Sequence, residues 1–199
     1  MRETVRLKGL VQPVALGDLV VSRAGKTPAR KKKAYWHGGL PWITAKDLKT
    51  LRLSSSQETI STLAVQDGAP IAQPGDILIL VRGMTLLKDV PIGIVEAPMS
   101  FNQDIRCLSP RGSILGDISS NYLAYVLLAS RDRLMACVTQ AGHGTGRLAI
   151  DQLLSMPVPV PPTQVQEWLV DRIRPIERAI SVLDELITAK REFKRGLMQ

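Results

Sequence analysis

The chain has 199 residues, of which 45% are hydrophobic, and its 26 basic and 18 acidic residues give a formal net charge of +8. It is long and apolar enough to bury a sizeable core. Its charge favours an acidic partner, such as nucleic acid or a membrane surface, and argues against an acidic mimic of DNA. No apolar run is long enough to span a membrane and Met1 leads into no hydrophobic signal segment, so we expect a cytoplasmic protein without a membrane partner.

The first predicted elements are a short apolar segment at residues 14–22 and a turn at Gly25 and Pro28. Four consecutive cations follow at residues 30–33. Four adjacent positive charges cannot be buried together, so they face either water or a polyanion.

Aromatic side chains follow the cations at Tyr35, Trp36 and Trp42. We expect them to anchor the core and a turn; the alternative, stacking on bases, would suit a single-stranded nucleic acid. Pro41 cannot donate a backbone hydrogen bond, so the strand that begins at Trp42 is predicted to lie at the edge of a sheet.

The middle of the chain is dominated by β-prone segments, which follow a polar stretch at residues 49–75 that carries loop signals. Residues 77–81 are continuously apolar and predict a fully buried strand that ends at Arg82-Gly83. Residues 92–95 predict a second, short strand. Residues 102–108 alternate between polar and apolar side chains, which predicts a half-buried strand.

Helical periodicity begins after residue 118, where Ser119 or Ser120 can cap a helix that we expect to end at Gly142. Residues 142–147 are too rich in glycine for regular structure and predict a loop. Alternating prolines make residues 156–162 extended. Cys107 lies in the strand region and Cys137 in the predicted helix; with no metal-binding spacing, both are expected to be free thiols.

Residues 163–197 predict the longest element, a helix of about 50 Å at roughly 1.5 Å per residue. Thr163 and Gln166 have the form of a capping box, and Pro175 is expected to kink or split the helix. An apolar seam with coiled-coil spacing must be covered by another helix, with folding back onto its own domain as the alternative. The predicted subunit-interface residues are Ile173, Ile176, Ile180, Leu183 and Ile187.

Several motifs, taken in order, resemble those of a known family. They are Gly25-Lys26-Thr27-Pro28, Tyr35-Trp36, Gly38-Gly39, Pro41-Trp42-Ile43, Asp47-Leu48, Gly75-Asp76-Ile77-Leu78 with Arg82-Gly83, Asn102-Gln103-Asp104-Ile105, and Pro157-Val158-Pro159 with Pro161-Pro162 and Gln166. This order resembles a target recognition domain followed by a spacer helix, as in the specificity subunits of type I restriction-modification enzymes. The resemblance covers most of residues 14–197.

The resemblance implies a mixed α/β fold. A globular recognition domain with a central β-sheet and flanking helices would occupy residues 1–160, and one long coiled-coil-type helix residues 161–199. Full-length members carry two recognition domains and two spacer helices, whereas this chain holds one of each, so it resembles a half-size subunit or a piece of a longer chain. Half-size subunits of the family pair head-to-tail, which implies a homodimer through the C-terminal helix.

The resemblance further implies that the chain performs no chemistry. It would hold double-stranded DNA for methyltransferase subunits and, as a further partner, a restriction subunit. The residues agree, because the sequence contains no dinucleotide-binding motif, no Walker motif and no Asn-Pro-Pro-Tyr segment of an amino-methyltransferase. Its two histidines and two cysteines offer no metal constellation. We therefore expect no enzyme activity, no cofactor and no metal.

Candidate DNA contacts fall into two kinds, because phosphate contacts set position and base-edge contacts set sequence. The cations of residues 26–33 are candidates for phosphate, or else form a solvated face. Arg82, at the tip of a strand, can reach guanine or form a structural ion pair, and Gln103 can pair with adenine or join a strand-edge network. The candidate set is Lys26, Thr27, Arg30, Lys31, Lys32, Lys33, Arg82, Gly83, Gln103, His143, Thr145 and Arg147.

Three other functions stay open at this level. A binder of RNA or single strands predicts that single strands quench the fluorescence of Trp36 or Trp42. A pure assembly adaptor predicts that the three lysines of residues 31–33 can be neutralised without effect. An unrecognised enzyme would need catalytic residues, for which the sequence offers only His143 with an arbitrary serine and aspartate.

Overall fold

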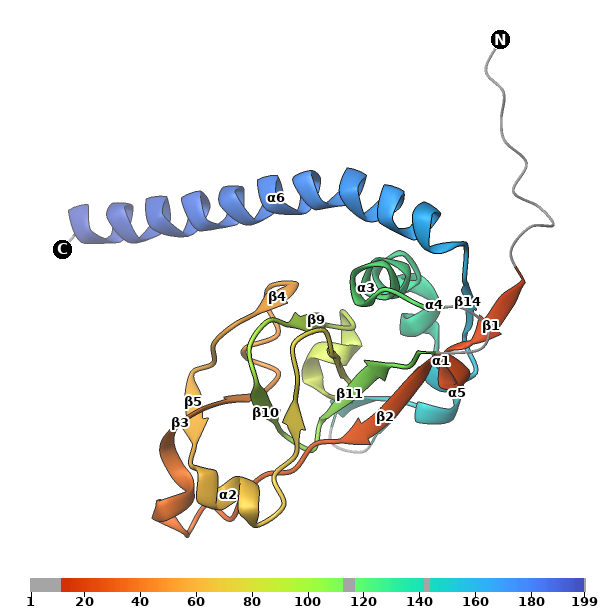
Figure 1. Cartoon of the computed structure of the whole chain (residues 1–199). Coiled ribbons are helices and arrows are strands. Elements are labelled where there is room, and N and C mark those ends of the chain that lie inside the picture. The colour runs from red at the N-terminus through yellow and green to blue at the C-terminus, as the bar shows by residue number, and fades with distance from the viewer. Residues whose placement is uncertain (1–11, 113–116, 142–143, 199) are drawn as a thin grey trace.

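The computed structural model describes residues 12–112, 117–141 and 144–198, and Figure 1 shows a mixed α/β domain from which one long helix extends. The helices are α1 Leu16–Leu19, α2 Thr62–Gln66, α3 Ser120–Ala129, α4 Arg131–Ala136, α5 Ile150–Leu154 and α6 Thr163–Leu197. The strands are β1 Pro13–Ala15, β2 Val20–Ala24, β3 Trp36–Ile43, β4 Arg52–Leu53, β5 Glu58–Ile60, β6 Ile71–Ala72, β7 Ile77–Leu80, β8 Arg82–Gly83, β9 Ile92–Val95, β10 Met99–Phe101, β11 Ile105–Pro110, β12 Val138–Ala141, β13 Thr145–Leu148 and β14 Pro157–Pro159.

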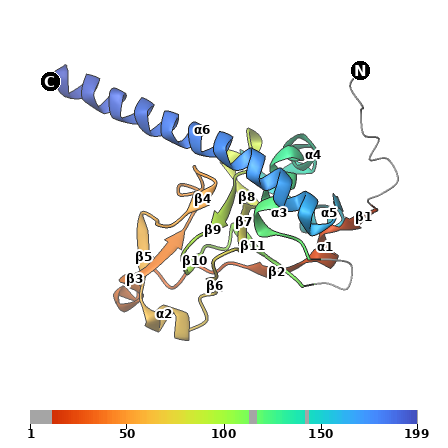
Figure 2. The ribbon, with the colours of Figure 1, turned by 45° about the horizontal axis from the view of Figure 1, so that its top comes forward.

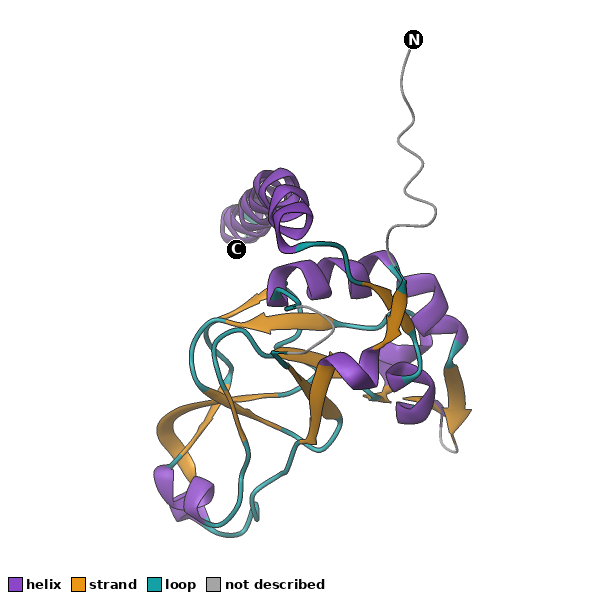
Figure 3. Cartoon of the chain, turned by 45° about the vertical axis from the view of Figure 1, so that its right-hand side comes forward, coloured by secondary structure: helices purple, strands orange, loops and turns teal. Residues whose placement is uncertain are grey.

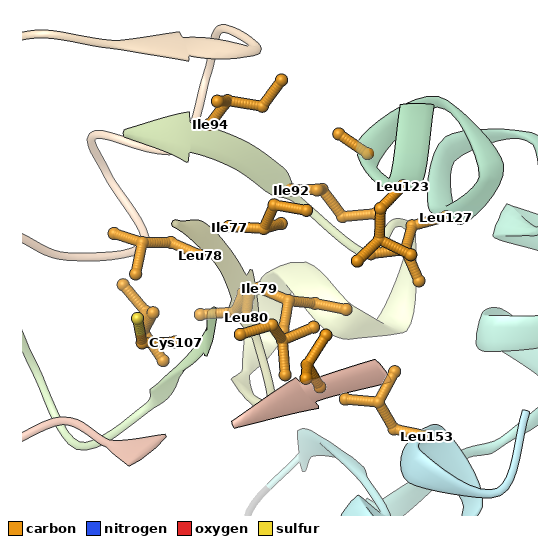
Figure 4. Close-up of a cluster of buried hydrophobic side chains, with 14 of the residues drawn as sticks. Ile77, Leu78, Ile79, Leu80, Ile92, Ile94, Cys107, Leu123, Leu127 and Leu153 are labelled. Carbon is orange, nitrogen blue, oxygen red and sulfur yellow. The ribbon is translucent and has the colours of Figure 1, made fainter. Parts of the chain in front are cut away.

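The largest sheet has the strand order β2-β11-β7-β9-β4. Its central strand β7 is buried at every position, as its continuous apolar run predicts. Side chains of β7 and β9 share one core cluster with Leu123 and Leu127 of α3, where Ile92 lies beside Leu123, and with Leu153 of α5 (Figure 4). Burial of each such aliphatic side chain contributes about 1.5–3 kcal/mol to the free energy of folding, so this cluster dominates the stability of the domain.

A second sheet, β5-β3-β10-β6, carries the aromatic segment and its own small core. Tyr35, Trp42 and Ile60 are buried there, which confirms that these aromatic side chains anchor the fold. The prediction of an edge strand at Trp42 is wrong, because β3 lies between β5 and β10. The sheet tolerates Pro41 because the register of β3 shifts just before it and the N–H of Trp42 is satisfied by the hydroxyl of Ser56, 2.9 Å away.

The region after residue 100 differs from prediction in three places. Residues 102–104 form a turn rather than part of a strand, and β11 begins only at Ile105. The single helix expected to end at Gly142 is replaced by α3, α4 and the strand β12, although Ser119 does cap the start, its hydroxyl accepting from the N–H of Tyr122 at 3.3 Å. The glycine-rich segment predicted as a loop contains β13, which lies between β12 and β8 in a third sheet.

The polar stretch at residues 49–75 is also more regular than its composition suggests, because it contains β4, β5, α2 and β6. The three strands pair with strands from other parts of the chain, which supplies the order that their own sequence lacks. The proline segment is extended as predicted, and β14 pairs antiparallel with β1 (Figures 1 and 3).

Helix α6 begins at the proline segment without the predicted capping box. The Gln166 side chain is buried and turns away from the helix end. Its amide donates to the carbonyls of Asp117 and Pro161, both at 2.9 Å, and its oxygen accepts from the N–H of Ser119 at 2.9 Å. The glutamine therefore ties α6 to the start of α3. Its side chain makes three hydrogen bonds in this position, more than a capping box would give it.

Helix α6 runs through Pro175 without being split. Ile173 is half-buried against the main core, so it belongs to its own domain rather than to an exposed interface. From Arg178 onward every described residue is exposed, and Figure 2 shows α6 projecting beyond the domain. The helix does not fold back, and the seam from Ile176 to Ile187 is uncovered. None of the described helices combines the length and the apolar composition needed to cross a membrane.

Candidate nucleic-acid interface

Three segments of the chain meet at one end of the largest sheet. Strands β2 and β7 end, and β11 begins, at the same level, because Ile105 pairs with Leu80 and Arg106 pairs with Ala24. Backbone hydrogen bonds tie the loops together: the carbonyl of Asp104 accepts from the N–H groups of Val81 and Arg82 at 2.8 and 3.2 Å. We call this end of the sheet the reading edge, and define it by residues 25–27, 102–104 and 82–83.

Thr27 and Gln103 lie side by side on the reading edge, with the Thr27 hydroxyl donating to the side-chain oxygen of Gln103. The turn beneath them is held by Asn102, whose side-chain oxygen accepts from the N–H of Asp104 at 3.1 Å. Gly25 is needed for this approach, since a Cβ at that position would stand 1.8 Å from the carbonyl oxygen of Asn102. A depression of about 390 Å³ opens beside the pair, and its lining includes Thr27, Asn102 and Gln103.

In the third sheet Arg82 of β8 pairs with Arg147 of the adjacent strand β13, and Gly83 pairs with Gly146. Both arginines are exposed. Gly83 has a φ of 139°, a backbone conformation that favours glycine, and it re-aims the chain where β8 passes into a 3₁₀ turn. The structure thus brings four of the predicted contacts together: Arg82 and Gly83 of the reading edge, and Thr145 and Arg147 of the neighbouring strand β13. His143 lies outside the described residues.

The basic segment, residues 26–33, contains two kinds of cation: those already bound to other side chains or backbone carbonyls of the domain, and those left free, within the described part of the chain, to bind a ligand. The guanidinium of Arg30 lies 3.9 Å from the ring centre of Trp36 and 2.8 Å from the carboxylate of Glu58, so it is held in a cation–π and ion-pair arrangement. Lys31 and Lys33 are exposed, and their side chains make no hydrogen bond or ion pair with any residue in the described ranges.

Two further lysines of the basic segment are anchored near α2. Lys26 donates to the backbone carbonyl of Asp67 at 2.6 Å, and Lys32 donates to the Tyr35 hydroxyl at 2.6 Å. That hydroxyl donates in turn to the carboxylate of Asp67 at 2.5 Å. The hydrogen bond from Tyr35 lowers the pKa of Asp67, and the hydrogen bond to Tyr35 raises the pKa of Lys32. Asp67 was recognisable from sequence only as part of an Asp-Gly turn, not as the anchor of the basic segment.

The described residues offer no site for a metal, because nowhere in them do three or more histidine, cysteine, aspartate or glutamate side chains gather. Both cysteines are free. Burial, the neighbouring carboxylate of Asp76 and its hydrogen bond with the thiol raise the pKa of Cys107 to about 12, so this thiol is not a nucleophile. What the reading edge offers chemically is hydrogen-bond donors, acceptors and positive charge.

Comparison with known proteins gives this arrangement a family. Residues 9–189 match the family described as "Type I restriction modification DNA specificity domain". The chain is 26% identical to the EcoR124I/EcoR124II specificity subunit of Escherichia coli, over 96% of this chain and 44% of that protein. It is 28% identical to the MjaIX specificity subunit of Methanocaldococcus jannaschii, over 88% and 38%. The chain therefore spans less than half the length of these curated relatives.

Solved structures agree on the fold. The crystal structure of the HsdS subunit from Thermoanaerobacter tengcongensis superposes with a TM-score of 0.63 at 20% identity, covering 93% of this chain and 42% of that one. The type I system S subunit from M. genitalium superposes with a TM-score of 0.62 at 13% identity, covering 96% and 46%. The resemblance and the mixed α/β fold predicted from sequence are both confirmed. Because the family match spans most of its residues, this chain belongs to the type I restriction-modification DNA specificity domains.

Proposed function

We propose that the chain is a non-catalytic subunit that recognises double-stranded DNA by sequence and reads one half-site per copy. One observation carries the proposal: in a member of the DNA specificity family, residues from three distant segments converge on a single reading edge. Thr27 and Gln103 supply adaptable hydrogen bonds there, and Arg82 with Arg147 supplies paired positive charge. Base-edge contacts of this kind, in the major groove, read sequence.

The electrostatics of the two arginines support an anionic or acceptor-rich ligand. Like charges directly opposite each other on neighbouring strands are destabilising. A DNA phosphate, or the two acceptors of a guanine edge, placed between Arg82 and Arg147 would remove that repulsion. The uncommitted Lys31 and Lys33 provide phosphate contacts farther along the duplex.

The proposal divides the chain at the proline segment. Residues 1–160 would form the recognition unit, and residues 161–199 the helix that assembles subunits. The uncovered seam supports assembly, because its four large apolar side chains lie on one helix face and leave water when another helix covers them, which is favourable. The proposed partners are methyltransferase subunits, a restriction subunit and a second copy of this chain, within the cytoplasm.

Selection from random duplexes tests this function. The chain, alone and with its methyltransferase subunit, retains DNA from a pool that is then sequenced. A bipartite motif with a fixed spacer is expected, and a symmetric motif would mean that two identical copies act together. No enrichment under either condition would refute sequence-specific recognition.

Matched arginine variants locate the reading surface. Arg82→Ala and Arg147→Ala are each expected to relax the selected sequence at one or two positions and to weaken binding about tenfold or more. Arg111→Ala is the control, because Arg111 is exposed just beyond the opposite end of β11, where its N–H donates to the carbonyl of Leu19 at 2.8 Å. Equal losses in all three variants would place recognition elsewhere.

A further inference from the structure

Elements from three parts of the chain meet at the side chain of Arg52, in β4. Its guanidinium donates twice to one carboxylate of α6, Nε to Oε1 of Glu177 at 2.7 Å and Nη2 to Oε2 at 3.0 Å. Its third nitrogen donates to the side-chain oxygen of Asn121 at 2.7 Å. Tyr125 completes the cluster, its hydroxyl donating to Glu177 at 2.5 Å. We call these four residues the α6 latch.

The latch is sheltered and strongly paired. The Arg52 side chain is 27% exposed and that of Glu177 is 17% exposed, whereas those of the surface pair Arg30–Glu58 are 54% and 44% exposed. Burial alone would raise the pKa of the Glu177 carboxyl, but hydrogen bonds from Arg52 and Tyr125 and the guanidinium charge outweigh it and lower the pKa. The bidentate geometry also fixes direction, because a planar fork meets a planar carboxylate in one orientation.

The position of the latch along α6 is the informative feature. The first turns of the helix are held by the buried Gln166 and Val170 and by the half-buried Ile173. Pro175 comes next, and it cannot donate to the carbonyl four residues earlier, which makes the helix easiest to bend there. Glu177 is the last described residue of α6 that is partly buried, because every described residue after it is exposed. The latch thus joins the helix to the domain just beyond its weakest point.

Everything beyond the latch acts as a lever. The roughly 20 residues that follow Glu177 form an arm of about 30 Å at 1.5 Å per residue. A change of about 10° in the direction of this arm moves its end by about 5 Å, or roughly one and a half base pairs at 3.4 Å per base pair.

We propose that the Arg52–Glu177 pair, closed by Tyr125 and Asn121, is a positioning latch that holds α6 in one direction across Pro175, and thereby sets the distance at which a partner recognition domain is held on DNA. The spacing role rests on the proposed function. The holding role does not, and the two are tested separately.

Distances between two spin labels test the holding role. In a Cys137→Ser background, Ser55→Cys and Gly196→Cys place one label on the domain and one near the end of α6, while Cys107 is buried and unreactive. Labelled chain is measured in an excess of unlabelled chain, so that distances within one copy are observed. The intact latch is expected to give one narrow distance distribution.

Glu177→Ala and Glu177→Gln are expected to broaden that distribution by several ångströms without unfolding the domain. Pro175→Ala, added to Glu177→Ala, is expected to narrow it again, because a continuous hydrogen-bonded helix no longer needs the latch. Glu185→Ala is the control, since Glu185 is an exposed glutamate on the same helix beyond the latch. An unchanged distribution in both Glu177 variants would overturn the proposal.

Selected DNA spacers test the spacing role. The wild-type complex is expected to enrich one spacer length, and Glu177→Ala two or three adjacent lengths, with the half-site sequences unchanged. Identical spacer distributions would overturn the spacing role. If the wild-type complex enriches no DNA sequence, the proposed function and the spacing role are both refuted. The distances between the spin labels still decide whether the latch holds the helix.

Discussion

The exposed seam of α6 allows a quantitative prediction for assembly. Ile176, Ile180, Leu183 and Ile187 are 61%, 56%, 56% and 46% exposed. Full burial of one such side chain is worth about 1.5–3 kcal/mol, so covering the exposed half of each gives about 1 kcal/mol. Two copies that pair along this seam would gain about 8 kcal/mol, which is comparable with the cost of about 4–15 kcal/mol for bringing two proteins together.

The double variant Ile180→Asp with Leu183→Asp removes half of that gain, about 4 kcal/mol for a pair of helices, before any cost of burying the new carboxylates. At 1.4 kcal/mol per factor of ten, association should weaken about a thousandfold or more. Sedimentation equilibrium over a wide concentration range measures this for the chain alone, and light scattering measures it for the complex with methyltransferase subunits.

Val182→Asp is the matched control, because Val182 is 61% exposed but lies two residues from Ile180 and so on a different side of the helix. It should associate like the wild type. Circular dichroism and tryptophan fluorescence should be unchanged in all variants, because none of these residues touches the core. An unchanged mass for the double variant, alone and with its partner subunits, would refute the role of the seam.

Three further outcomes concern the reading edge, the basic segment and the latch. Gly25→Ala should destabilise the domain by at least about 1–3 kcal/mol, measured by denaturant unfolding, since the new methyl group would meet the rigid backbone carbonyl of Asn102 at 1.8 Å; normal stability would contradict the close approach. Lys31→Gln with Lys33→Gln should weaken binding to all duplexes alike and flatten the dependence of affinity on salt by about two phosphate contacts; an unchanged slope would count against phosphate anchoring. Because the folded-state pKa of Glu177 is lowered, its contribution to stability is present above its ordinary pKa of 4.5 and is lost as pH falls through the folded value, so the wild type and Glu177→Gln should converge in stability in acid; a constant difference down to the lowest pH would contradict the pairing.

The sequence predicts those parts of the fold in which the structure favoured by the local pattern is also the one that the tertiary contacts require. The continuous apolar run at residues 77–81 predicts a buried strand, and β7 (Ile77–Leu80) is that strand. The seam of α6 can be predicted because helical periodicity persists over many turns, and every described residue after Glu177 is exposed.

The parts that sequence mispredicts are those decided by distant partners. Gly146 looks like a loop residue, yet β13 needs glycine there because a Cβ would lie 2.7 Å from Leu86 of the neighbouring turn. Gln166 looks like a capping residue, yet its amide is taken by carbonyls outside the helix. Val138 continues a helical period but pairs with Leu148 in a sheet. Each choice depends on a contact that no local window contains.

The same distinction applies to the reading edge. The candidate residues can be chosen by type, because arginine, glutamine and threonine are the side chains that read duplexes. Their convergence cannot, since it depends on the pairing of β11 with both β2 and β7 and of β13 with β8. The commitment of Arg30 to Trp36 and Glu58 was equally hidden, because a cation in a basic run shows nothing of its partners.

The pairing of β1 with β14 has a consequence for how such a domain can be inherited. The strand through which the described chain enters the domain and the strand through which it leaves towards α6 are neighbours, with Val14 opposite Val158. A unit whose first and last strands pair with each other has both of its junctions at one place. Its interior can therefore be replaced without moving the points at which it joins a longer protein. Under the proposed function, replacing the interior of this unit would change the DNA sequence that it recognises, while the β1–β14 junction and α6 stay as they are.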